Sequence, residues 1–179
     1  MNNFGKIILI QKFNKVTYYS VSVNDDVSLF QKFIEKHTIE NKDKLYHIMA
    51  WIEKIGNKIG AYQIYFRNEA ETSDASALPP HGIDRVPAYV EVIENNKRVN
   101  VPNNLRLYCL RANNSVVFLF SGDVKTAAKP QDCSKVKSHF KMANRLTKLI
   151  NEAFIKKDIV WNSDFSDIIF NGGFELEFN

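Results

Sequence analysis

The sequence predicts an α+β fold, in which an antiparallel sheet carries an N-terminal helix pair and one later helix packed on it. Three observations lead to this class. Runs rich in β-branched and aromatic residues open the chain and return after its midpoint. Between and after them, apolar residues recur at spacings of three and four, as on one face of a helix. An apolar fraction of 45% over 179 residues supplies the core of one domain, 1–179.

The first two β-rich runs predict an N-terminal hairpin over 1–23. They read KIILI (6–10) and VTYYSVSV (16–23), and both favour a pleated, half-buried strand. Asn14 and Lys15 lie between them and suit a turn.

Two amphipathic helices are expected next, joined by a short polar turn. Asn24 or Asp25 can cap the first helix. Its apolar face is formed by Val27, Phe30, Phe33, Ile34 and His37. The second helix is expected to begin near Asp43 and to end at Gly60. The pair should lie as an α-hairpin over the sheet.

Residues 68–87 show no apolar period and are rich in Ser, Ala, Asp and Pro, which predicts a long surface loop or insertion. Three strands are expected after it: AYVEVIE (88–94), LRLYCLR (105–111) and SVVFLFSG (115–122). The last two are separated by three residues and should form a tight hairpin. SVVFLF is apolar on both faces, which predicts a central strand.

A third helix is predicted from Ser134 to Lys156, with an apolar inner face and lysines around its wet side. The remaining residues, 157–179, predict short acidic strands with a turn at Gly172 and Gly173.

Charge is concentrated near the end of the chain. Residues 121–160 hold nine Lys and Arg against four Asp and Glu, whereas 161–179 hold four acids and no base. The basic segment can bind an anionic partner, or the basic and acidic segments can neutralise each other within the fold.

Several functional classes lack their motifs. No apolar stretch approaches the length of a membrane span, and the first residues do not read as a secretory signal. With only Cys109 and Cys133, a reducing cytoplasm is the expected setting. The four histidines and two cysteines lack metal-ligand spacing, so no metal site and no cofactor are expected. Neither a phosphate-binding glycine loop nor a serine nucleophile elbow occurs.

Arg106 is the first candidate for chemistry. Alternation along LRLYCLR places Arg106, Tyr108 and Leu110 on one face of the strand, inside an apolar pattern. A buried guanidinium is costly without a partner. Arg106 therefore either meets an internal carboxylate or opens into a cleft that holds an anion, and the sequence leaves both alternatives open.

Lys125 is the second candidate, because it follows the central strand on the hairpin neighbour of Arg106. If the two cations converge, they concentrate positive potential where a phosphodiester can bind. If they do not, Lys125 is an ordinary solvated lysine. Tyr108 can add a stacking surface or a hydroxyl, or it is a core aromatic. His139, on the third helix, is either a solvated or capping residue or a proton donor near the cleft.

The order of these elements resembles the RelE/HigB-like toxins of bacterial type II toxin–antitoxin modules. Such proteins carry two helices, a middle strand with an arginine near its start, an apolar strand that ends near a glycine, a basic stretch and a further helix. LRLYCLRANNSVVFLFSGDVKTAAKPQD follows that order, after the helix pair at 25–59. The resemblance covers residues 25 to about 154, and places a RelE-like core within 24–156.

The resemblance implies a cytoplasmic, ribosome-dependent endoribonuclease that cuts mRNA and is held inactive by an antitoxin, often a small helix-turn-helix protein. Attack by the RNA 2′-hydroxyl would proceed without a metal ion, with cations stabilising the negative charge on the oxygens of a pentavalent phosphorane. Catalysis would then involve Arg106, Lys125, Tyr108 and His139. RNA would be bound by Lys129, Arg111, Lys137 and Lys141.

An alternative is a non-catalytic interaction module on the same fold, either a ParE-like inhibitor of a partner protein or a relative that binds an antitoxin-like helix. Asp123 bears on this choice, because its negative charge lies beside the expected phosphate site. The acidic residues Asp164, Asp167, Glu175 and Glu177 either cover the basic surface or lie in a peripheral strand pair.

Overall fold

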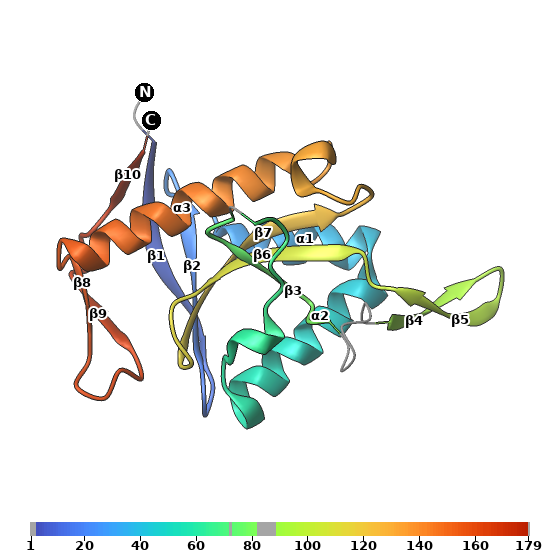
Figure 1. Ribbon diagram of the computed structural model, residues 1–179, viewed down its shortest axis with the longest axis horizontal. Helices are drawn as coiled ribbons and strands as arrows, with labels where there is room; N and C mark the ends of the chain where they lie inside the picture. The colour runs from blue at the N-terminus through green and yellow to red at the C-terminus, as the bar shows by residue number, and fades with distance from the viewer. Residues whose placement is uncertain (1–2, 72, 82–88, 179) are drawn as a thin grey trace.

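The computed structural model describes residues 3–71, 73–81 and 89–178, and it has the α+β architecture that the sequence predicts. A six-stranded sheet in the order β10-β1-β2-β7-β6-β3 carries helices on both faces (Figure 1). Four neighbouring pairs are antiparallel, and β2 and β7 are parallel. The sheet is therefore mixed, because β2 and β7 come from two separate hairpins placed side by side.

The N-terminal hairpin is confirmed. β1 (Asn3–Lys12) and β2 (Thr17–Val23) pair antiparallel with a register shift near Ile10. At the outer edge, the short β10 (Leu176–Phe178) pairs with the first residues of β1. The two ends of the chain thus meet at one edge of the sheet (Figure 1).

The helix pair is also confirmed, with a different first cap. α1 (Leu29–Glu40) begins after Ser28, whose Oγ accepts a hydrogen bond from the Gln31 N–H at 3.1 Å. The expected caps Asn24 and Asp25 instead have positive φ angles, in the turn after β2. α2 (Lys42–Lys54) continues into one π-helical turn, Ile55–Ile59, and ends at Gly60 with φ of 98°.

The predicted surface loop at 68–87 lies partly outside the described residues, and its described part is not all surface. β3 (Ser76–Leu78) pairs with β6 at the edge of the sheet, and Ala77 and Leu78 are fully buried. β3 has only three residues and is followed by prolines. A strand this short shows no alternating pattern, so the sequence did not predict it.

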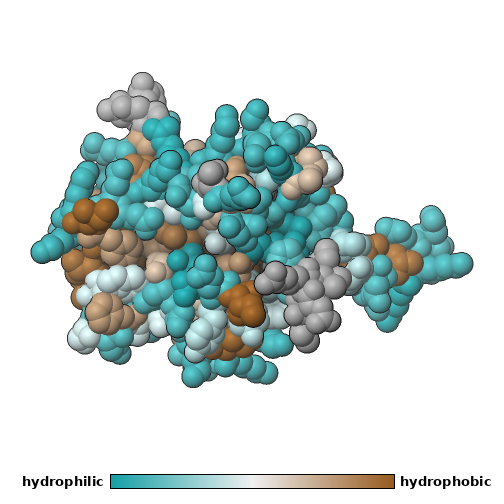
Figure 2. Space-filling view, viewed as in Figure 1, coloured by the Kyte–Doolittle hydropathy of each residue, from teal (hydrophilic) through white to brown (hydrophobic). Residues whose placement is uncertain are grey.

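The central hairpin matches the prediction. β6 (Leu105–Arg111) and β7 (Val116–Val124) pair antiparallel, and β7 lies inside the sheet between β6 and β2. The strand expected at 88–94 is observed as β4 (Tyr89–Glu94), with Ala88 outside the described residues. It pairs with β5 (Lys97–Pro102), which was not predicted, in a separate hairpin. That hairpin projects from the body, and its far end is hydrophilic (Figures 1 and 2).

α3 (Lys137–Ile155) crosses one face of the sheet, and β8 (Ile159–Trp161) and β9 (Ile168–Phe170) follow it as a small hairpin. The sheet separates two apolar cores. Phe118, Tyr108 and the inner face of α3 belong to one, and the inner faces of α1 and α2 belong to the other. Among the described residues, no helix has the length and apolar character required to cross a membrane.

Candidate functional site

The candidate site begins at a close approach of β6 and β7. Arg106 lies opposite Asp123, and the register shifts between Leu107 and Cys109. Gly122 makes this approach possible, because a Cβ atom there would lie 1.7 Å from the Arg106 carbonyl oxygen. The glycine that ends the apolar run thus fixes the position of Arg106 relative to the residues that follow β7.

Arg106 meets an internal carboxylate. Its Nε donates to Glu69 Oε1 at 2.6 Å, and its Nη1 donates to the Asn103 carbonyl oxygen at 2.6 Å. The exposed fraction of the side chain is 9% for Arg106 and 6% for Glu69. Of the two alternatives for Arg106, the geometry is that of the internal ion pair.

Lys125 converges on the same carboxylate. Its Nζ donates to Glu69 Oε2, and its side chain is 11% exposed. Its backbone N–H donates to the Asn104 carbonyl oxygen at 2.8 Å, which fixes the chain leaving β7. Arg106 and Lys125 therefore meet, as their positions on the hairpin suggested, with Glu69 bridging them.

Arg67 is a third cation of this cluster, which sequence reasoning missed. It is 4% exposed, and its Nε donates to the Pro79 carbonyl oxygen at 2.6 Å. Within the described residues, its Nη2 has no hydrogen-bond partner. Burial and the neighbouring Arg106 guanidinium lower the pKa of Arg67 to about 10. We refer to Arg67, Glu69, Arg106 and Lys125 as the Glu69 cluster.

Asp123 does not belong to the Glu69 cluster. Its Oδ2 accepts a hydrogen bond from Lys36 Nζ of α1 at 2.7 Å, although Asp123 lies opposite Arg106 in the sheet. Burial disfavours its charged form, but hydrogen bonds from Lys36 and from the Val124 N–H hold the pKa of Asp123 below its ordinary value. Lys36 of α1 thus neutralises the negative charge of Asp123, which lies beside the expected phosphate site.

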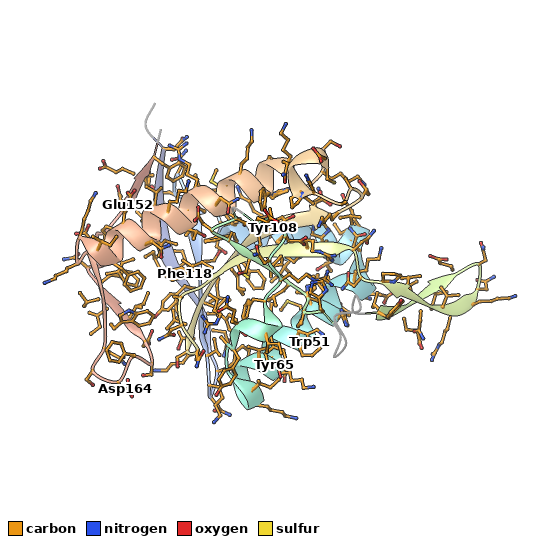
Figure 3. The ribbon with its side chains drawn as sticks, in the orientation of Figure 1. Trp51, Tyr65, Tyr108, Phe118, Glu152 and Asp164 are labelled. Carbon is orange, nitrogen blue, oxygen red and sulfur yellow. The ribbon has the colours of Figure 1, made fainter. Side chains whose placement is uncertain are left out.

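Tyr108 lies in the core under α3 (Figure 3). It has no exposed surface and packs edge-on against Phe140, with 5.5 Å between ring centroids. Burial raises the pKa of its hydroxyl, and that hydroxyl has no partner in the described part of the chain. This is the geometry of a core aromatic.

His139 lies at a different place from Arg106. It is half-buried beside Lys36 and Ser121, in a pocket between α1, β7 and α3. Burial lowers the pKa of its imidazole, and the charges that act on it are those of Asp123, Lys36 and His37. Of the four residues proposed for catalysis, Arg106 and Lys125 bind Glu69, and Tyr108 is buried in the core where the charges of Glu69 and Arg106 act on its hydroxyl. His139 lies apart from them.

The proposed RNA-binding residues also separate. Lys129, Lys137 and Lys141 are exposed, and the last two lie one turn apart on α3. Arg111 is held by the chain itself: its Nε donates to the Ala61 carbonyl oxygen and its Nη2 to Asn114 Oδ1, both at 2.6 Å. Only the three lysines are free to offer charge to an external anion.

The acidic tail does not pair with the Glu69 cluster. Asp167 accepts from the Tyr19 hydroxyl at 2.5 Å, and Glu175 lies 3.9 Å from Lys6. Asp164 lies in the β8–β9 loop, far from Tyr108 (Figure 3). The acids are thus divided between the small β8–β9 hairpin and the segment of β10 at the edge of the main sheet, and those named here do not contact the Glu69 cluster.

Within residues 3–71, 73–81 and 89–178, no three His, Cys, Asp or Glu side chains gather in a way that could hold a metal ion. Cys109 and Cys133 are both buried free thiols. Comparison of the chain with protein-family models, curated proteins and solved structures gives no match in any of the three.

Proposed function

We propose that this protein acts by binding a partner protein, as a non-catalytic relative on a RelE/HigB-like fold. The observation that carries the proposal is the state of Arg106 and Lys125. Both bind Glu69, and all three side chains are about nine-tenths buried. A phosphodiester must reach such cations directly to be held and cleaved. Here RNA would first have to break two buried ion pairs.

The other expected catalytic residues support the same proposal. Metal-independent cleavage needs a proton donor and a proton acceptor within hydrogen-bond reach of the same phosphate. Tyr108 is fully buried, and His139 is influenced by Lys36 and Asp123 rather than by Arg106. A single bound phosphate could therefore not be within reach of all four expected catalytic residues.

A groove of mixed character offers a place for the partner. It lies between β1 and α1 and has a volume of about 550 Å³. Its lining includes the apolar residues Ile8, Ile10, Phe30 and Ile34 and the charged residues Lys6, Asp25 and Asp26. α1 packs on β2 and β7, so β1 lies beyond the helical layer, and Ile8 is 38% exposed. An amphipathic helix laid in a groove is a recurrent recognition mode. A partner helix placed beside α1 would extend the layer over β1.

The test is binding to the protein encoded by the adjacent reading frame, where that frame encodes a small helix-turn-helix protein. Calorimetry with purified proteins should give a complex that Ile8→Lys weakens by about tenfold or more, since a buried unpaired charge is costly. Ile39→Lys is the matched control, because Ile39 is 87% exposed on α1 and does not line the groove. Equal weakening by both variants, or no complex, would count against the proposal.

A ribosome-dependent endoribonuclease is the second candidate, and one observation favours it. The Glu69 cluster has three cations and one carboxylate, which leaves two positive charges in excess, and Arg67 Nη2 is unpaired among the described residues. If Glu69 moved away, these cations would suit a phosphate. This candidate requires a conformation in which Glu69 is released.

Induction in a bacterial host separates the two candidates. The wild-type chain, Arg106→Ala and Glu69→Ala are expressed in turn, growth is followed, and mRNA ends are mapped. New ends from the wild type that disappear in Arg106→Ala, while circular dichroism shows that this variant is still folded, would establish the nuclease and overturn the partner-binding proposal. New ends from Glu69→Ala alone would mean that Glu69 blocks a competent site.

A further inference from the structure

A preformed pocket lies between α1, β7 and α3, apart from the Glu69 cluster. Its volume is about 160 Å³, and its apolar wall includes Phe33, Phe120 and Met142. An apolar cavity of about 150 Å³ accommodates a molecule the size of benzene. The space therefore suits one aromatic ring or a branched chain of similar bulk.

Lysine side chains form part of the polar side of the pocket. Lys36 Nζ donates one hydrogen bond to Asp123, and an ammonium group has three N–H donors to offer. Lys32 also lines the pocket. Its Nζ lies 2.5 Å from Oδ2 of Asp26, a residue that does not line the pocket. Both lysines are paired with a carboxylate, so the pocket offers an anion the remaining N–H donors of the Lys36 ammonium rather than a net positive charge.

His139 is the second polar group, and neither of its ring nitrogens has a hydrogen-bond partner among the described residues. His139 is half-buried and lines the pocket from α3, whereas Phe33 and Lys36 line it from α1. An imidazole can donate to a carboxylate from either nitrogen, depending on its tautomer.

The wall behind the pocket is fixed rather than adaptable. His37 is fully buried, with Nε2 3.2 Å from the Gly122 carbonyl oxygen and Nδ1 2.9 Å from Asn41 Nδ2. Both ring nitrogens are thereby satisfied, so His37 supports the wall and leaves recognition to Lys36 and His139. A preformed site loses less entropy on binding than one that must be ordered.

We propose that this pocket binds a small carboxylic acid, with one ring or a comparable branched group between Phe33, Phe120 and Met142, and its carboxylate at Lys36 and His139. The site shares no residue with the Glu69 cluster. Binding of a small acid in this pocket is a separate property from the proposed function. It can be measured whether or not the protein binds a partner protein or RNA.

The test uses benzoate as the probe and methionine methyl groups as the reporters. The chain has three methionines, so a spectrum of protein labelled with ¹³C at these methyl groups is simple. Titration with benzoate should shift Met142 and leave Met49 of α2 unchanged, because Met49 does not line this pocket. A dissociation constant of about 1 mM or below is expected for so small a ligand.

Benzyl alcohol tests the carboxylate, because it keeps the ring and removes the charge. It should bind about tenfold more weakly than benzoate, since it loses a charge-assisted hydrogen bond. His139→Asn and Lys36→Met should each weaken benzoate and leave benzyl alcohol little changed. Lys141→Met is the matched control: it removes a nearby lysine that does not line the pocket, and benzoate affinity should be retained.

Three results would overturn the proposal. One is the absence of a Met142 shift at millimolar benzoate. Another is equal affinity for benzoate and benzyl alcohol. The third is an equal loss of benzoate affinity in Lys36→Met and Lys141→Met, which would indicate attraction by general charge. Because Lys36→Met leaves Asp123 unpaired, His139→Asn, which changes a half-buried residue, keeps the test valid if the lysine variant fails to fold.

Discussion

Asp123 lies opposite Arg106 in the sheet, yet its carboxylate binds Lys36, with 2.7 Å between Oδ2 and Nζ. Cross-strand neighbours of opposite charge often pair. Here each residue pairs with a different element, Asp123 with α1 and Arg106 with Glu69. The two ion pairs join the central hairpin to α1 and to the segment before β3, so both should contribute to stability.

Glu69→Gln should destabilise the fold strongly. The amide keeps the shape but removes the single negative charge shared by the buried Arg106 and Lys125. Breaking a buried ion pair in this way costs about 3–5 kcal/mol. Urea unfolding followed by circular dichroism measures the change.

Glu71→Gln is the matched control, since Glu71 is exposed two residues further along the chain. Its free energy of unfolding should stay within about 0.5 kcal/mol of the wild type. If the two variants are equally stable, the Glu69 cluster is not a structural element.

Gly122→Ala should also destabilise the fold, because its Cβ would lie 1.7 Å from the Arg106 carbonyl oxygen and would force β6 and β7 apart. Overpacking of this kind costs about 1–3 kcal/mol or more. Gly172→Ala serves as the control, since no atom lies within 4 Å of the added Cβ. Similar unfolding midpoints for the two variants would contradict the role assigned to Gly122.

The central hairpin could be predicted because its signal is local. Alternation along β6 correctly separated Arg106, Tyr108 and Leu110 from Leu105, Leu107 and Cys109, and the two sets do face different sides of the sheet. The apolar run of β7 likewise indicated a central strand. Within a single strand, the alternation of side chains determines which of them face each side of the sheet, so this part of the fold could be predicted without knowledge of tertiary contacts.

The partner of Arg106 could not be predicted in this way. Glu69 is 37 residues away from it, in a segment without apolar period, and it resembled an ordinary loop acid. The tertiary fold brings it to Arg106, partly through β3, whose three residues carry no strand signal. The sequence thus indicated where the cations meet, and only the structure identified the carboxylate between them.

Tyr108→Phe should leave the fold as stable as the wild type or stabilise it by about 1 kcal/mol. The Tyr108 hydroxyl is fully buried without a partner among the described residues, so its removal relieves a desolvation cost. Thermal and urea unfolding measure the effect. A loss of stability would mean that the hydroxyl has a partner, and loss of an RNA-cleaving activity in this stable variant would restore Tyr108 as a catalytic candidate.

Stability should decline as the pH falls from about 7 to about 5, because the fold disfavours the protonated form of one buried and two half-buried histidines. Burial lowers the pKa of His37, His47 and His139 below their ordinary value of 6.5. The unfolded chain therefore takes up protons first, so their contribution is complete above about pH 6.5 and decreases below it. Each histidine contributes at most about 1.4 kcal/mol per pH unit in this window.

His37→Gln tests the contribution of the fully buried histidine, because the amide can still donate to the Gly122 carbonyl oxygen but does not titrate. The difference in unfolding free energy between pH 7 and pH 5 should be smaller in this variant than in the wild type. Asp123 does not confuse the result, since its lowered pKa places its own loss of stability below about pH 4. An unchanged difference in His37→Gln would show that His37 is not the residue whose protonation opposes folding.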